Sequence, residues 1–115
     1  MSCLFESFSY FIKENRFDIR QKICDYLQNN EKIIDGLDTK SILAIEDENY
    51  IDNMRNEQTQ GGAIEIQVAC NIWNILVDVR DTQTSKNILF YPINTNYTKT
   101  IYLEWNGGHY EPIRC

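Results

Sequence analysis

The chain has 115 residues, of which 43% are hydrophobic and 12% aromatic, and its formal net charge at pH 7 is -6. This length supports one hydrophobic core, so residues 1–115 are expected to form a single domain. The composition excludes an intrinsically disordered chain, and no apolar run is long enough to span a membrane. An acidic chain without a basic face is also unsuited to binding nucleic acid, so no nucleic-acid or membrane partner is expected.

Four cysteines, at positions 3, 24, 70 and 115, are widely and irregularly spaced. Their spacing lacks the close pairs of a zinc site, so no metal is expected, and no secretory signal precedes them. We therefore expect reduced thiols in an intracellular, cytoplasmic monomer, with Cys24 and Cys70 in the core and Cys115 exposed. Heavy use of Ile and Asn suggests an AT-rich genome, such as a viral or parasitic one, which would place the protein in the host cytoplasm.

An amphipathic helix is predicted at the start of the chain. Its apolar residues recur at helical intervals and form one side, namely Leu4, Phe5, Phe8, Phe11 and Ile12. Ser2 is a suitable N-cap for this helix. Cys3 would then lie in the first turn, where free backbone amides and the helix dipole favour an anion.

Three further helices are predicted, within residues 17–30, 45–56 and 63–73. Between the first two, residues 31–40 read as a connector with a turn at Asp35-Gly36. The pair Gly61-Gly62 breaks the chain before the third, which has the composition of a buried helix. The side chains expected to point inward from the first are Phe17, Ile23, Cys24 and Leu27.

The second half of the chain changes to a strand pattern. Three runs rich in branched and aromatic residues, ILVDV (75–79), ILFYPI (88–93) and TIYLEW (100–105), are separated by polar loops. Helices followed by strands predict an α+β fold in which the helices pack on a small β-sheet. Pro92 cannot donate to a strand ladder and is expected at a strand end or a sheet edge.

Two residues could together perform nucleophilic chemistry, Cys3 in a first helical turn and His109, the chain's single histidine. A thiolate can attack a carbonyl carbon while an imidazole removes the thiol proton and later protonates the leaving amine. In an extended strand Glu111 would share a face with His109 and could hold the imidazole in one tautomer. Gly107-Gly108 would allow a substrate backbone to approach closely.

Each of these residues also has a plainer interpretation. Cys3 could be a small apolar residue near a chain end, His109 a structural or surface histidine, and Glu111 a solvated charge. Gly61-Gly62 could be a simple helix-entry turn. Spacing alone leaves both sets of interpretations open.

Three stretches in order resemble the ovarian-tumour (OTU) family of papain-like cysteine proteases, most of which are deubiquitinases. SCLFESFSYFI is similar to the family's nucleophile segment, and YIDNMRNEQTQGGAIEIQVACNIWNILV resembles its central block. IYLEWNGGHYEPI resembles its histidine segment. The resemblance runs from near residue 1 to residue 113 and implies a papain-like fold without a metal or organic cofactor.

The resemblance also implies roles for individual residues. Cys3 would be the nucleophile, His109 the general base and Glu111 the residue that orients the histidine. The implied reaction is thiol-dependent hydrolysis of isopeptide bonds after the C-terminal Gly-Gly of ubiquitin, including polyubiquitin chains, or of a ubiquitin-like modifier. The residues expected to bind the substrate are Gly61, Gly62, Trp105, Gly107, Gly108 and Tyr110.

The sequence departs from the family pattern at three points. Glu111 is one methylene longer than the usual Asp, and Gln60 replaces an aromatic residue often found before the glycines. The Asp-Gly-x sequence that usually precedes the cysteine, and helps to form the oxyanion hole, is not present before Cys3. This last departure leaves open an alternative, a catalytically weak or inactive OTU-like module that binds ubiquitin. A small interaction domain with only the same helix-strand order is a third possibility.

Overall fold

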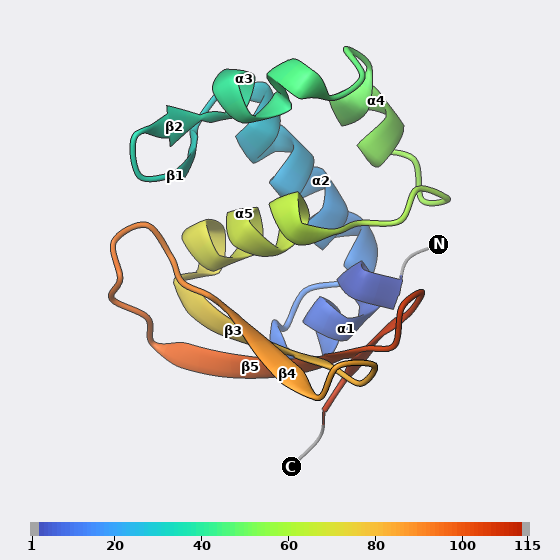
Figure 1. The fold of residues 1–115 in the computed structure, drawn as a ribbon. Coiled ribbons are helices and arrows are strands. Elements are labelled where there is room, and N and C mark those ends of the chain that lie inside the picture. Colours follow the sequence, from blue (N-terminus) through green and yellow to red (C-terminus); the bar gives the residue numbers. More distant parts are fainter. Residues whose placement is uncertain (1–2, 114–115) are drawn as a thin grey trace.

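A four-stranded sheet with helices on one face organises the protein, and the computed structural model describes residues 3–113 (Figure 1). The strands lie in the order β4-β3-β5-β6. β3 pairs antiparallel with β4 and parallel with β5, and β5 pairs antiparallel with β6. Their bounds are Ile75–Asp81 for β3, Lys86–Phe90 for β4, Lys99–Trp105 for β5 and Tyr110–Pro112 for β6. The predicted α+β class, with helices packed on a small sheet, is confirmed.

Three helices lie on one side of this sheet: α1 (Cys3–Phe11), α2 (Arg16–Gln28) and α5 (Ala63–Trp73). Figure 1 shows α1 and α5 between the sheet and α2, with α1 above the end of the sheet that carries β6. All three helices were predicted, with ends that differ by a few residues. None of the helices among residues 3–113 is long and apolar enough to cross a membrane.

The core lies between these helices and the sheet. Alternating residues of the central strands point into it, so Val77 and Leu103 are buried whereas Arg80 and Tyr102 are not. The fully buried side chains of α1 are Leu4, Phe5 and Phe8.

The two cysteines expected in the core are there. Cys24 and Cys70 are both free thiols with no exposed surface, and burial raises their pKa values to about 11 and about 12, respectively. They are therefore unreactive thiols at neutral pH. Ser2 and Cys115 lie outside the described residues.

The prediction that Phe17 points inward is wrong. Its side chain is 46% exposed, while Ile23 and Leu27 of the same helix are buried. Phe17 lies in the first turn of α2, where the guanidinium of Arg16 packs over its ring at 4.9 Å instead of a core element.

The predicted connector over residues 31–40 contains more structure than the sequence indicated. β1 (Lys32–Ile34) and β2 (Leu37–Asp38) form a hairpin around the predicted Asp35-Gly36 turn, with Gly36 at a φ of 82°. A distant side chain supports it, because the Asn71 amide of α5 donates to the Ile33 carbonyl at 2.9 Å.

The helix predicted over residues 45–56 is shorter than expected. The chain forms α3 (Thr39–Ile42), a 3-10 turn (Leu43–Ile45) and α4 (Tyr50–Met54). Asp47 prevents an earlier start for α4, because its carboxylate accepts from the Asn49 amide at 2.8 Å in a local turn.

Strand β4 also differs from its prediction, since residues 91–93 lie beyond its end. Two side chains of α5 hold that segment, because Gln67 donates to the Tyr91 carbonyl at 2.7 Å and Asn71 accepts from the Ile93 amide at 3.0 Å. Pro92 therefore lies just past the end of an edge strand, as predicted.

The N-cap of α2 gives a test of this helical layer. The Asn15 side chain accepts from the Asp18 amide at 2.9 Å, so Asn15→Ala should lower the free energy of unfolding by about 1 kcal/mol. Asn29→Ala at the other end of α2 is the matched control, because the cap bonds there come from the backbone. Urea unfolding of both variants measures the difference, and equal losses would contradict the capping role of Asn15.

Candidate active site

Cys3 begins helix α1 on the side that faces strand β6. The core fixes this orientation, because Leu4, Phe5 and Phe8 are buried and leave Cys3 partly exposed. Ser7, one turn later, is 2% exposed and donates its hydroxyl to the Cys3 carbonyl at 2.7 Å. The same hydroxyl oxygen lies 3.4 Å from the Tyr110 carbonyl of β6. Ser7 therefore joins the helix of Cys3 to the strand that follows His109.

His109 lies one residue before β6, after a tight turn that connects it to β5. Gly107 makes this turn possible with a φ of 95°, and the Gly108 amide donates to the Asn106 side chain at 3.2 Å. The imidazole Nε2 lies 3.3 Å from Glu111 Oε1, so the two side chains share a face as predicted. Both side chains are well exposed, at 45% and 65%, and water therefore screens the interaction between them.

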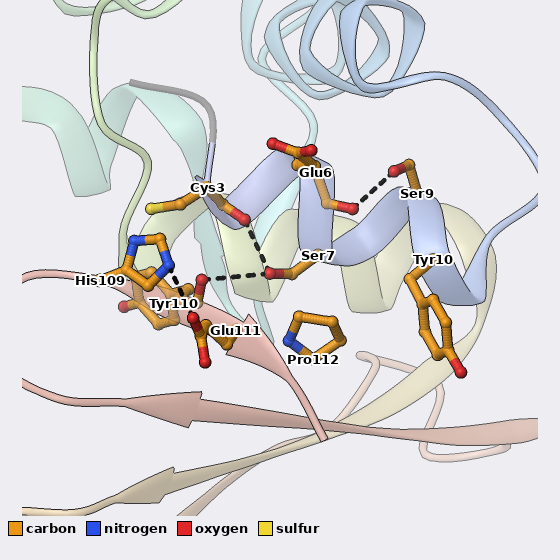
Figure 2. Close-up of a pocket in the computed structure, with 9 residues that line it drawn as sticks. All are labelled: Cys3, Glu6, Ser7, Ser9, Tyr10, His109, Tyr110, Glu111 and Pro112. Atoms are coloured by element: carbon orange, nitrogen blue, oxygen red, sulfur yellow. Dashed lines mark hydrogen bonds and ion pairs between the residues drawn. The ribbon is translucent and has the colours of Figure 1, made fainter. Parts of the chain in front are cut away.

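One pocket of about 550 Å³ brings Cys3, His109 and Glu111 together. Figure 2 shows the Cys3 sulfur beside the edge of the His109 ring that carries Nδ1, while Nε2 points to Glu111. The other residues that line the pocket are Glu6, Ser7, Ser9, Tyr10, Tyr110 and Pro112.

Within residues 3–113, the Cys3 thiol and the His109 imidazole are not hydrogen-bonded to each other. Catalytic hydrogen bonds often form only when substrate is bound. Tyr110 packs beside the thiol, and burial together with the nearby Cys3 raises the pKa of its hydroxyl. The Tyr110 ring also packs on Trp105, with centroids 4.6 Å apart.

The residues predicted to bind substrate divide into two groups. Tyr110 lines the pocket with Cys3 and His109. Three others do not line the pocket: Trp105 packs against the Tyr110 ring, and Gly107 and Gly108 lie in the turn before His109.

Gly61 and Gly62 lie outside the pocket and have separate structural roles. A methyl group built on Gly61 would lie 2.8 Å from Leu4 Cδ2 and 2.9 Å from Phe5 Cζ, so its backbone packs directly on α1. Gly62 is the N-cap of α5, as the helix-entry interpretation expected, and its amide donates to Glu65 Oε1 at 2.7 Å.

Three buried polar residues near the site were missed from the sequence: Ser7, Arg20 and Glu65. Glu65 is 1% exposed and also accepts from the Tyr50 hydroxyl at 2.6 Å, and burial raises the pKa of its carboxyl. The sequence does indicate their burial, because each of the three polar residues lies at helical spacing from apolar residues that face the core. In the described part of the chain, no group of three His, Cys, Asp or Glu side chains could hold a metal ion.

A thiol beside an imidazole, with a carboxylate at the other ring nitrogen, is the arrangement of cysteine proteases. A family model described as OTU-like cysteine protease matches residues 2–110, and the chain belongs to this family. The sequence is 29% identical to ubiquitin thioesterase OTU1 of Xenopus laevis over 98% of this chain. It covers 38% of that relative, so it spans well under half of the longer protein.

Solved structures agree with this assignment. An OTU domain in complex with ubiquitin has a TM-score of 0.77 and 26% identity, covering 96% of this chain and 62% of that chain. The OTU domain of OTUD1 has a TM-score of 0.75 at 15% identity, covering 99% and 79%, and shows the shared fold. The likeness therefore goes beyond the order of helices and strands.

Gly61 offers a test of the packing behind Cys3. Gly61→Ala should lower the free energy of unfolding by about 1–3 kcal/mol, because the new methyl group would overlap Leu4 and Phe5. Gly108→Ala is the control, since nothing lies within 4 Å of a methyl group there. Chemical denaturation compares the two, and a Gly61→Ala protein as stable as Gly108→Ala would contradict the close packing.

Proposed function

We propose that this protein is a cysteine-type deubiquitinase that hydrolyses isopeptide bonds after the C-terminal Gly-Gly of ubiquitin or a ubiquitin-like modifier. The observation that carries the proposal is the shared pocket of Cys3, His109 and Glu111 in a chain of the OTU-like cysteine protease family. The relative named ubiquitin thioesterase and the neighbour solved with ubiquitin support the choice of substrate. We place the activity in the cytoplasm, on ubiquitin or polyubiquitin conjugates.

The first step forms an acyl-enzyme. Nδ1 of His109 takes the proton of the Cys3 thiol, and the thiolate sulfur attacks the carbonyl carbon of the terminal glycine. Glu111 accepts from Nε2–H, which leaves Nδ1 as the proton acceptor and stabilises the imidazolium. As the carbon–nitrogen bond breaks, His109 returns the proton to the leaving lysine amine.

The second step releases the modifier. His109 removes a proton from a water molecule, whose oxygen attacks the thioester carbon between the glycine and Cys3. The carbon–sulfur bond breaks, and His109 returns its proton to the thiolate. The new carboxylic acid of ubiquitin loses the second water proton to solvent, and ubiquitin leaves as a carboxylate. The position of Cys3 at the start of α1 favours the negative charges of both steps, because the helix dipole is positive there.

The pocket also suggests how the Gly-Gly tail is held. We propose that Tyr110 contacts the tail beside the thiol and that Trp105 supports the Tyr110 ring from behind. The exposed turn at Gly107-Gly108 leaves room for the extended tail to approach His109.

Cleavage of di-ubiquitin tests the proposal. A panel of linkages should give turnover by the wild-type chain and a loss of at least about 1000-fold in Cys3→Ala, because no other described cysteine lines the pocket. Cys70→Ala is the matched control and should retain activity, since that thiol is buried in α5. Binding of ubiquitin with no turnover of any linkage would instead support an inactive binding module and contradict the proposal.

Glu111 tests how the histidine is oriented. Glu111→Gln should lower kcat by about tenfold, a modest loss because both partners are exposed and solvent-screened. Glu104→Gln is the matched control, because it removes the same charge at the position directly opposite Glu111 in the sheet register. Steady-state kinetics separate the two, and an equal fall in both variants would show a general charge effect without orientation of His109.

A further inference from the structure

Arg20 is a charged side chain in the core that the proposed mechanism does not use. It lies on α2 and is 1% exposed. Its Nη1 donates to the Met54 carbonyl at 2.8 Å and its Nη2 donates to the Glu57 carbonyl at 3.2 Å. A buried guanidinium is costly unless its donors are satisfied, so these bonds stabilise Arg20 and connect α2 to the end of α4 and to the segment that follows it.

The same guanidinium also contacts the helix of Cys3. Its Cζ lies 4.1 Å from the centroid of the Phe5 ring, two residues after Cys3. Phe5 is completely buried, and the Gly61 backbone also packs against its ring. Phe5 is thus held by Arg20 and by Gly61, which lies at the end of the segment that Arg20 binds.

That segment reaches the turn before His109. Gln60 donates its side-chain amide to the Gly108 carbonyl at 3.3 Å, next to His109. Arg20 therefore contacts the Cys3 helix directly, at Phe5. It is connected to the histidine turn only indirectly, through residues 54–60. These contacts add a second connection between the two elements, besides that of Ser7, whose hydroxyl connects α1 to β6.

We propose that Arg20 is a positioning residue that sets the placement of the Cys3 helix relative to the turn of His109. This inference rests on the proposed function, because it concerns the alignment of the same catalytic pair. Arginine suits the role through its planar fork, which donates to two carbonyls while its face packs on an aromatic ring. A lysine ammonium has a single donor centre and no flat face, so it cannot reproduce all three contacts.

Arg20→Lys and Arg20→Met test the inference, with Arg55→Lys as the matched control. Arg55 also connects the end of α4 to α2, through Gln21 at 2.7 Å and Asp25 at 2.9 Å. These partners lie on α2 and not on the Cys3 helix, which Arg20 contacts. Hydrolysis of a fluorogenic ubiquitin amide should show kcat lower by about tenfold or more in both Arg20 variants, with KM changed less than about twofold. Arg55→Lys should match the wild type.

A second readout separates positioning from loss of folding. The pH dependence of Cys3 alkylation by iodoacetamide, mapped by mass spectrometry, should differ from wild type in Arg20→Lys at temperatures where circular dichroism shows a folded protein. If Arg20→Met does not fold, Phe5→Leu provides the second variant, because it removes the ring and keeps the carbonyl contacts of Arg20. It should show the same selective fall in kcat.

The outcomes distinguish this inference from the proposed function. A wild-type chain without hydrolysis overturns the proposed function, and the inference with it. An active wild type together with a folded Arg20→Lys protein of unchanged kcat and alkylation profile overturns the role of Arg20 alone.

Discussion

The contact between helix α1 and the backbone at Gly61 is the constraint on which the site depends. Leu4 and Phe5 approach that backbone so closely that even a methyl group on Gly61 would overlap them. Because these residues directly follow Cys3, burying them leaves the thiol on the opposite side, where β6 and His109 lie. The hydrophobic effect thus orients the Cys3 side chain, and the absence of a side chain at position 61 sets how closely helix α1 can pack on that backbone.

Polar contacts complete what this packing begins. Ser7 joins α1 to β6 on the pocket side, and Glu65 holds the amide of Gly62 at the start of α5. The buried side chains of Ser7 and Glu65 are hydrogen-bonded, whereas the pair of His109 and Glu111 is open to water. Buried hydrogen bonds therefore hold the elements that carry Cys3 and His109, and the imidazole itself is accessible to solvent.

The sequence predicted the parts of this structure that depend on local patterns. Apolar spacing identified the three long helices and the three main strands, and the i, i+2 relation placed Glu111 beside His109. The parallel pairing of β3 with β5 could not be predicted, because strands separated by a loop and a further strand carry no register signal. The β1-β2 hairpin was missed for a similar reason, since it depends on the distant Asn71.

Buried polar residues show the same limit within the site. The inward position of Arg20 depends on two carbonyls more than thirty residues away, and a pattern along α2 cannot identify such partners. Phe17 is the converse case, an aromatic residue at core spacing whose neighbours in space do not cover it. Local spacing therefore identified the catalytic candidates, and tertiary contacts decided what supports them.

The central claim is that Cys3 is the nucleophile toward the C-terminus of ubiquitin. The most direct measurement is intact-mass spectrometry of the protein after incubation with ubiquitin that carries a propargylamide electrophile at its C-terminus, followed by peptide mapping. The account predicts a single covalent adduct, located on Cys3 and missing from Cys3→Ala. A folded protein that forms no adduct, or one that forms the adduct equally well without Cys3, would contradict it.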